Sequence, residues 1–330
     1  METPLLRDLV PIERVWSRLE AVETRLHEVS TSDNPFVTEI AQHLMTGGKR
    51  YRPMLAQVAA EIGGDGGAAP VEAGVAVELI HLGSLYHDDV IDEAGSRRGQ
   101  TSVNANWSNT IAILAGDFLL ARASEVAAPL GTEAVALLAR TYARLCEGQV
   151  LELQLGNDLD HGPEDYFRVI ENKTASLIRT SARLGAMAGG AGRAHVEAAT
   201  RWGHEVGMVF QLTDDVLDLL ATEEFLGKPA GSDIREGTFT LPVIYALRGK
   251  EGDRVRRLLE GGKPYPADAV EEVIGLVQRG GHLEQVLDET ERRIAAADAA
   301  IAELPDGDVT KVLRALGEFL VARVDQAREG

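Results

Sequence analysis

Cysteine is almost absent from this chain of 330 residues, with Cys146 as its only example. A single cysteine cannot form an intrachain disulfide, which fits a reducing compartment. We expect Cys146 to be a small, buried apolar residue. No apolar run approaches the roughly 20 residues of a membrane span, and the first residues mix charged with apolar side chains, unlike a secretory signal. The sequence therefore predicts a cytoplasmic protein without stable membrane insertion.

Positive charge and aromatic side chains are also scarce. The chain has 33 Lys and Arg against 52 Asp and Glu, a formal net charge of −19. This charge repels nucleic acid and anionic membranes, so we expect no nucleic-acid partner, and an anionic substrate would need metal ions and a local basic patch. Aromatic residues make up 5% of the chain, and abundant Ala, Leu, Val, Glu and Arg favour helix over strand. An all-α fold is predicted.

Glycine and proline interrupt the chain at residues 63–70, 156–163, 189–192 and 261–266. Between these breaks the apolar residues recur with helical spacing, and long helices are predicted over residues 71–92 and 198–220. The length would permit two domains, but no linker divides the chain. We therefore expect a single domain over residues 1–330.

Each predicted long helix ends in an aspartate cluster with the pattern DDxxD. The first contains Asp88, Asp89 and Asp92, and the second contains Asp214, Asp215 and Asp218. Residues four apart lie on one helix face, so each cluster can aim two carboxylates at one point. Oxygen ligands of this kind suit Mg²⁺, which also takes water and substrate phosphates as ligands. Two clusters predict a diphosphate held between two metal-loaded helices.

A solvated acidic face is the alternative for one such motif. Two copies make it less favoured, because apolar residues surround both. Carboxylates are also disfavoured near the C-terminal end of a helix by the helix dipole, so metal binding explains their position better than stability does.

Basic side chains lie near the first cluster. Gly47 and Gly48 precede Lys49, Arg50 and Arg52, where free backbone N–H groups and guanidinium groups can hold a phosphate. Arg97 and Arg98 follow the first cluster in a predicted loop. His81 lies two turns before Asp88 on nearly the same face, although a histidine on an apolar helix is more often a core residue. Lys173 and Thr174 lie on a helix-like stretch, where a lone lysine is usually solvated.

Together these residues resemble the trans-isoprenyl (polyprenyl) diphosphate synthases. The resemblance covers about 200 residues, in order, from Gly47 to about Leu247. Besides the clusters and cations above, it includes Gly116-Asp117, Gly148-Gln149, Phe210-Gln211, Gly227-Lys228-Pro229 and Thr240-Leu241-Pro242. One position departs from the pattern: Gly237 is followed by Thr238, where many members have a lysine that contacts the allylic diphosphate.

The resemblance implies an isoprenoid synthase-type helical bundle with a deep central cavity, usually a homodimer. It implies that Asp88, Asp89, Asp92, Asp214 and Asp218, with Asp215 near them, hold three Mg²⁺ ions on the diphosphate of an allylic substrate. Arg97, Lys173, Thr174 and Gln211 would bind that substrate, and Lys49, Arg52, His81 and Arg98 would bind isopentenyl diphosphate. Catalysis would rest on both aspartate clusters and Lys173.

Product length in this family depends on residues one turn before the first cluster, where large aromatic side chains stop chain growth. Here Gly83 and Ser84 are small. At roughly 1.5 Å per residue they lie about 6–7.5 Å below the acidic side chains, and Ile80 and Val77 are the next limits. The expected product is medium- to long-chain, with geranylgeranyl diphosphate as the alternative. Gly83 could instead serve close helix packing, and Tyr86 is a large aromatic residue nearby.

Two other classes of protein are less favoured by these residues. A terpene cyclase also uses aspartate-rich helices and Mg²⁺, but it needs no isopentenyl diphosphate pocket of the kind that Lys49, Arg52, His81 and Arg98 would form. A regulatory subunit of a heteromeric synthase would be expected to lose its acidic motifs, and this chain keeps both. A catalytic synthase is the favoured interpretation.

Overall fold

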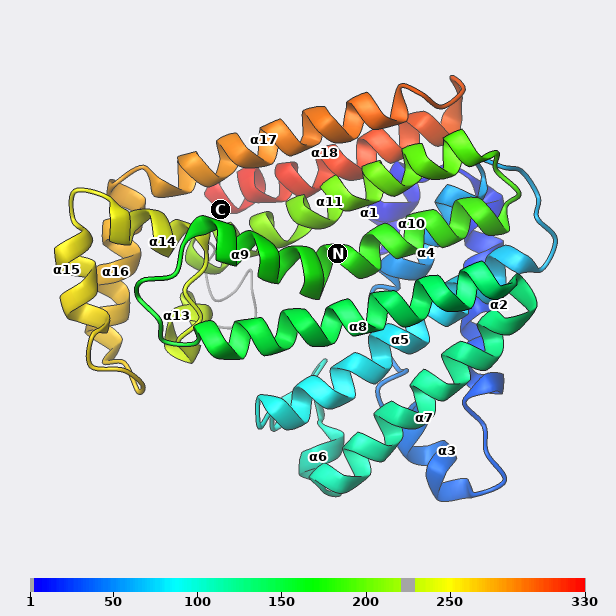
Figure 1. Ribbon diagram of the computed structural model, residues 1–330, viewed down its shortest axis with the longest axis horizontal. Coiled ribbons are helices and arrows are strands. Elements are labelled where there is room, and N and C mark those ends of the chain that lie inside the picture. Colours follow the sequence, from blue (N-terminus) through cyan, green and yellow to red (C-terminus); the bar gives the residue numbers. More distant parts are fainter. Residues whose placement is uncertain (1–2, 221–228, 330) are drawn as a thin grey trace. The chain divides into compact units, whose positions relative to one another are not determined.

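The structure is a computed structural model that describes residues 3–220 and 229–329, and Figure 1 shows this part as helices joined by short loops. Its only strands within that range are β1 (Ser96–Arg97) and β2 (Gln100–Thr101), which form a two-residue antiparallel hairpin. The prediction of an all-α fold is confirmed. Gly227-Lys228 of the family pattern lies outside the described residues.

The chain divides into two compact units. The first consists of Met1–Ala143, Leu177–Gly203 and Ile301–Leu313, and the second of Arg144–Ser176, His204–Ala300 and Arg314–Gly330. Each unit joins segments that are distant in sequence. The single domain over residues 1–330 stays a prediction, as does the central cavity.

Elements that belong wholly to the first unit come from the N-terminal part of the chain. They are α1 (Thr3–Leu9), α2 (Glu13–Val29), α3 (Pro35–Gln42), α4 (Tyr51–Ala60), α5 (Ala69–Ile91), the hairpin β1–β2, α6 (Val103–Asn106), α7 (Asn109–Ala127) and the short 3₁₀ helix η1 (Ala128–Leu130). Helix α5 packs along α7 and also contacts α2 and α4.

Two glycines allow α5 and α7 to approach closely. A side chain at Gly83 would meet Gly116 O of α7 at 3.1 Å, and one at Gly116 would meet Gly83 O at 3.0 Å and the His87 ring at 2.4 Å. Gly116 therefore supports the α5 segment that ends in the first aspartate cluster. This contact gives a physical reason for one element of the family pattern.

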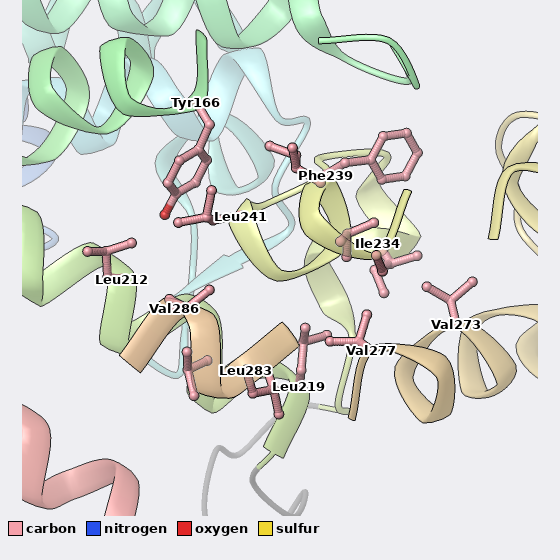
Figure 2. Close-up of a cluster of buried hydrophobic side chains, with 14 of the residues drawn as sticks. Tyr166, Leu212, Leu219, Ile234, Phe239, Leu241, Val273, Val277, Leu283 and Val286 are labelled. Atoms are coloured by element: carbon pink, nitrogen blue, oxygen red, sulfur yellow. The ribbon is translucent and has the colours of Figure 1, made fainter. Parts of the chain in front are cut away.

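The second unit draws on segments that follow Ala143. Those wholly within it are α9 (Pro163–Ile170), the π-helical turn η2 (Glu171–Ala175), α13 (Ser232–Glu236), α14 (Leu241–Arg248), α15 (Gly252–Leu259) and α16 (Ala267–Arg279). Five helices contribute residues to both units: α8 (Thr132–Leu155), α10 (Ser176–Ala188), α11 (Arg193–Leu220), α17 (His282–Ile301) and α18 (Asp308–Glu329). Figure 2 shows the apolar core of the second unit, which includes Tyr166, Leu212, Phe239, Leu241 and Val286.

Both predicted long helices are confirmed. Residues 71–92 correspond to α5, and residues 198–220 to the C-terminal part of α11. Among the described helices, none has a stretch long and apolar enough to cross a membrane. The prediction for Cys146 is wrong: it is exposed on α8, because the buried residues Leu145, Gly148 and Gln149 occupy other positions around that helix.

Candidate active site

The first aspartate cluster lies at the C-terminal end of α5. Asp88 is partly buried and Asp92, which ends the helix, is exposed. Asp89 is fully buried, and its Oδ1 accepts a hydrogen bond from Arg97 Nε at 2.7 Å and forms an ion pair with Arg97 Nη2 at 2.7 Å. Burial raises the pKa of Asp89, and the Arg97 cation opposes that rise. Asp89 therefore anchors Arg97, whereas Asp88 and Asp92 are the more accessible carboxylates.

The hairpin after α5 separates the two adjacent arginines. Arg97 lies in β1, while Arg98 and Gly99 form the turn with φ values of 54° and 76°. Positive φ at both turn residues is typical of a tight hairpin. Arg97 reaches Asp89, whereas Arg98 donates from Nη1 to Leu44 O at 3.0 Å. The two guanidinium groups are therefore held in different places, as the expected division between two substrates requires.

The residues expected to bind isopentenyl diphosphate lie on α4, α5 and the hairpin. Lys49 is exposed, and Arg52 Nη1 lies 3.3 Å from His81 Nε2. Burial lowers the pKa of His81 well below its usual range, and the nearby cations, led by Arg52 and Arg98, lower it further. A neutral His81 can accept the Arg52 hydrogen bond at Nε2 and keep the ring proton on Nδ1. The structure brings Arg52 and His81 together.

Arg50 organises this basic segment through ion pairs that the sequence did not predict. It precedes α4 with a left-handed φ of 45°. Its guanidinium donates to Met45 O, forms an ion pair with Glu23, and forms another with Glu78 at 3.1 Å. Glu78 is only 1% exposed, so its charge needs a cation nearby. Arg50 thus connects the start of α4 to Glu78 of α5, which lies one turn before His81.

The residues expected to control product length have different surroundings. Gly83 is buried against α7, in the close contact with Gly116 described above. Ser84 is partly exposed, and its hydroxyl donates to His81 O at 2.8 Å. Tyr86 is fully buried, and its hydroxyl donates to Ile40 O at 2.7 Å, at the end of α3. Gly83 therefore serves helix packing, whatever else it does, and Ser84 is the more accessible of the two small residues.

The second aspartate cluster lies near the end of α11. Asp214 is partly buried and forms an ion pair with Arg323 of α18 at 3.3 Å. Asp218 is 2% exposed, and its Oδ2 accepts a hydrogen bond from the backbone N–H of Asp233 at 3.3 Å. Asp215 is 1% exposed and accepts from the Tyr166 hydroxyl on Oδ2 and from Gln211 Nε2 on Oδ1. Burial raises the pKa of Asp215 well above its usual range, and the charge of Asp233 adds to that rise.

Lys173 and Thr174 lie on the π-helical turn η2, between α9 and α10. Single π turns inside helices are frequent at functional sites. Two glycines give this turn close neighbours: a side chain at Gly148 of α8 would meet Lys173 N at 2.7 Å, and one at Gly207 of α11 would meet Ala175 Cα at 2.6 Å. Lys173 forms an ion pair with Glu152 of α8. Gly148 therefore belongs to the support of the turn.

The predicted residues fall into two groups, one in each compact unit. Within the second unit, Thr174 Oγ1 donates to Gln211 Oε1 at 2.7 Å, so residues 37 apart in sequence are joined. Sequence reasoning missed the residues that support these groups: Arg50, Glu152, Tyr166 and Arg323. Arg50 lies inside a motif already singled out, and Tyr166 precedes Lys173 by seven residues. Arg323 carries no signal in the sequence.

The chemistry of the two clusters fits Mg²⁺ that binds together with a diphosphate. Among residues 3–220 and 229–329, no three carboxylate, imidazole or thiolate side chains are close enough to form a metal site alone. Mg²⁺ is commonly held by one or two carboxylates, with water and substrate phosphates as the other ligands. Oδ2 of Asp89 is buried and has no hydrogen-bond partner in the described structure, which leaves oxygen lone pairs available beside Asp88.

Comparisons with known proteins agree with this fold. The family model for polyprenyl synthetase matches residues 34–277. The nonaprenyl diphosphate synthase of Mycobacterium tuberculosis is 41% identical over 300 residues, which cover 90% of this chain and 89% of that protein.

Solved structures of two bacterial synthases superpose closely on this chain. The decaprenyl diphosphate synthase from Rhodobacter capsulatus gives a TM-score of 0.89 at 33% identity, covering 97% of this chain and 99% of the other. A geranylgeranyl pyrophosphate synthase from Corynebacterium glutamicum, complexed with calcium and isoprenyl diphosphate, gives 0.84 at 41% identity, covering 94% and 96%.

An all-α fold with two aspartate clusters and separately held arginines defines the class of isoprenoid prenyltransferases. The chain belongs to the polyprenyl synthetase family. The resemblance inferred from its motifs is thereby confirmed, and so is the prediction that it is a prenyltransferase.

Proposed function

We propose that this protein condenses isopentenyl diphosphate with an allylic diphosphate, head to tail (1'-4), to make a medium- to long-chain all-trans polyprenyl diphosphate. The observation that carries the proposal is the pair of aspartate clusters, each at the end of a long apolar helix. Relatives that make nonaprenyl and decaprenyl diphosphate support the product class.

Asp88, Asp89, Asp92, Asp214 and Asp218 would hold Mg²⁺, three ions per active site, with Asp215 near them. When bound, the metal supplies positive charge that neutralises the departing diphosphate. The complex of the Corynebacterium glutamicum relative with calcium and isoprenyl diphosphate supports a divalent ion with this type of ligand.

The basic and polar side chains assigned to substrate divide into two sets, one for each substrate. Arg97, Lys173, Thr174 and Gln211 bind and orient the allylic diphosphate, while Lys49, Arg52, His81 and Arg98 bind isopentenyl diphosphate. The allylic C–O bond breaks and its electron pair leaves with diphosphate. The double bond of isopentenyl diphosphate then attacks the allylic cation, and a proton passes to the released diphosphate. Negative charge develops on the departing diphosphate, so electrostatic stabilisation by the protein lowers the barrier most at that group.

Product length is the finer part of the proposal. Ser84 is small and partly exposed, one turn before Asp88, which favours a long chain. The geranylgeranyl synthase relative, at 41% identity, keeps a shorter product as the second candidate. We also propose a homodimer, as the resemblance implies, which light scattering of the purified protein would test.

Product analysis tests the proposal. Purified protein is incubated with radiolabelled isopentenyl diphosphate and each of several allylic primers, with Mg²⁺ or with excess chelator, and the products are separated by chromatography. We expect chains longer than geranylgeranyl diphosphate and no product after chelation. Absence of elongation with every primer would contradict the function, and geranylgeranyl diphosphate as the final product would contradict the chain length.

The variant Ser84→Phe then tests the length determinant. A ring about one turn below Asp88 should shorten the product toward farnesyl or geranylgeranyl diphosphate while initiation continues. Ser84 is preferable to Gly83, because Gly83→Phe would clash with α7. Thermal melting accompanies the assay, since overpacking costs roughly 1–3 kcal/mol. If a folded, active Ser84→Phe variant gave products of unchanged length, Ile80, Val77 or another helix would be the better candidate.

A further inference from the structure

Tyr166 places a hydroxyl group in a core made mostly of aliphatic and aromatic side chains. Its side chain is 5% exposed and belongs to the core of the second unit with Leu212, Leu241 and Val286. Figure 2 labels Tyr166 among the residues of this cluster, with its hydroxyl oxygen in red. A phenylalanine would fill the same space. Packing alone therefore does not account for the hydroxyl group.

Within the described part of the chain, the hydroxyl has one hydrogen-bond partner, which belongs to the second aspartate cluster. Tyr166 donates to Asp215 Oδ2 at 2.5 Å, across 49 residues of sequence. Asp215 is 1% exposed, and a buried carboxylate depends on hydrogen-bond donors from the protein. Gln211, one turn earlier on α11, supplies the other donor to Oδ1 at 2.8 Å. Both oxygens of Asp215 are thus held by side chains.

The network fixes the orientation of the Gln211 amide. Its Nε2 donates to Asp215, so its Oε1 points the other way and accepts from Thr174 Oγ1 at 2.7 Å. Tyr166 and Thr174 lie on the continuous segment formed by α9 and η2, whereas Asp215 and Gln211 lie on α11. Three hydrogen bonds therefore link four side chains in a chain that starts on η2, passes through α11 and ends on α9. The π turn that carries Lys173 is fastened to the helix that carries the second cluster.

We propose that Tyr166 is a positioning residue for the reaction: through Asp215 and Gln211 it holds Thr174 and the π turn in register with the second aspartate cluster. This inference rests on the proposed function, because Thr174, Gln211 and the cluster are the groups assigned there to the allylic diphosphate. Tyr166 itself does not touch substrate in this scheme. Loss of the Tyr166 hydroxyl should therefore weaken binding of the allylic diphosphate and leave binding of isopentenyl diphosphate unchanged.

The variant Tyr166→Phe removes only the hydroxyl. Tyr265→Phe is a matched control, because Tyr265 lies in the same apolar core and its hydroxyl donates to Asn157 Oδ1 at 2.9 Å and not to an aspartate of the cluster. Steady-state kinetics are measured while each substrate and Mg²⁺ are varied. For Tyr166→Phe we expect kcat/KM for the allylic substrate to fall on the order of 10-fold or more, with the KM of isopentenyl diphosphate within about twofold of wild type. The control should stay within about twofold in both.

A second readout does not depend on elongation. Binding of inorganic diphosphate with Mg²⁺, measured by calorimetry, should weaken roughly 10-fold in Tyr166→Phe and stay unchanged in Tyr265→Phe. The double variant Tyr166→Phe/Asp215→Asn protects the test against misfolding, because it removes the buried charge together with its donor. It should show the same loss as Tyr166→Phe, since the two residues act as one unit.

The outcomes separate the two proposals. Wild-type protein that binds diphosphate but makes no polyprenyl product would contradict the proposed function and leave the binding comparison valid. Active wild type with Tyr166→Phe and the double variant both within about twofold in kinetics and binding would overturn the positioning role. Equal losses in Tyr166→Phe and Tyr265→Phe, in step with equal losses in melting temperature, would also overturn it, because they would show a structural role only.

Discussion

The two aspartate clusters share a sequence pattern but stabilise their middle carboxylate in different ways. In the first cluster Asp89 is held by a cation, Arg97, on a hairpin eight residues away. In the second, Asp215 is held by two neutral donors, Tyr166 and Gln211. A cation favours the ionised carboxylate strongly, whereas neutral donors only partly offset burial. The same motif thus tolerates two kinds of local electrostatics, and the partly buried first carboxylate, Asp88 or Asp214, is the common part.

Removing an accessible carboxylate should have the largest effect and should be equally severe in both clusters. Asp88→Ala and Asp214→Ala should each lower kcat on the order of 10²-fold or more, because each removes charge stabilisation that acts mainly in the transition state. Chelation should abolish turnover. Asp253→Ala, at an exposed position on α15, serves as the control in the same steady-state assay. Near-normal turnover in both variants after metal removal would reject the common role of the clusters.

The arginine that anchors Asp89 should be separable from its neighbour. Arg97→Ala should mainly raise the KM of the allylic substrate and Arg98→Ala that of isopentenyl diphosphate. A lost charge-assisted bond costs roughly 1.5–3 kcal/mol, or about 10- to 100-fold, for one ligand. Initial-rate measurements with each substrate varied in turn give both constants. Should both variants raise the KM of the same substrate alone, the division between the arginines is wrong.

Replacing the middle carboxylate of each cluster by an amide should change the free energy of unfolding by different amounts. Asp89→Asn breaks an ion pair and should lower the free energy of unfolding by roughly 1.5–3 kcal/mol. Asp215→Asn removes a buried charge that has only neutral donors, and the Tyr166 hydroxyl can turn to accept from the new amide, so the loss should stay below about 1 kcal/mol. Urea titrations at neutral pH measure both values. Equal losses would mean that the two sites stabilise their carboxylates alike.

His81 should produce a pH dependence that must be known before pH is used to compare the clusters. Folded His81 stays neutral because its pKa is lowered, whereas the unfolded chain takes up a proton at this residue below about pH 6.5. The unfolded state then binds more protons, so the free energy of unfolding falls as pH drops below about 6.5. His81→Gln should reduce that slope by up to about 1.4 kcal/mol per pH unit. Urea titrations between pH 5 and 8 test this, and an unchanged slope would show that His81 is already protonated in the fold.

The sequence predicted the parts of the molecule that depend on local pattern. Apolar spacing predicted α5 and α11, and the DDxxD clusters lie near the C-terminal ends of these two helices. The glycine breaks were found for the same reason, since glycine and proline act on their own neighbourhood. The exposed position of Cys146 was missed, because composition says nothing about which face of α8 a residue occupies.

Contacts between distant residues could not be predicted in this way. Tyr166 meets Asp215 across 49 residues, and Arg323 meets Asp214 across 109. Neither pair leaves a periodic signal in the chain. The tight hairpin at Arg97 and Arg98 and the π turn at Lys173 also went unseen, because both depend on backbone conformations that their residue types do not demand. Motifs in the sequence predicted the residues assigned to substrate, whereas only the folded structure shows the residues that support them.

The π turn η2 has a consequence for insertions and deletions in the family. A residue added to a helix rotates everything after it by about 100° around the axis. Because Lys173 and Thr174 lie within the widened turn, their direction depends on one extra residue between α9 and α10. Loss of that residue would leave a regular helix and an almost unchanged helix content. It would nevertheless rotate the side chains of α10 around the helix axis relative to those of α9. The length of this short segment is therefore constrained more tightly than its composition.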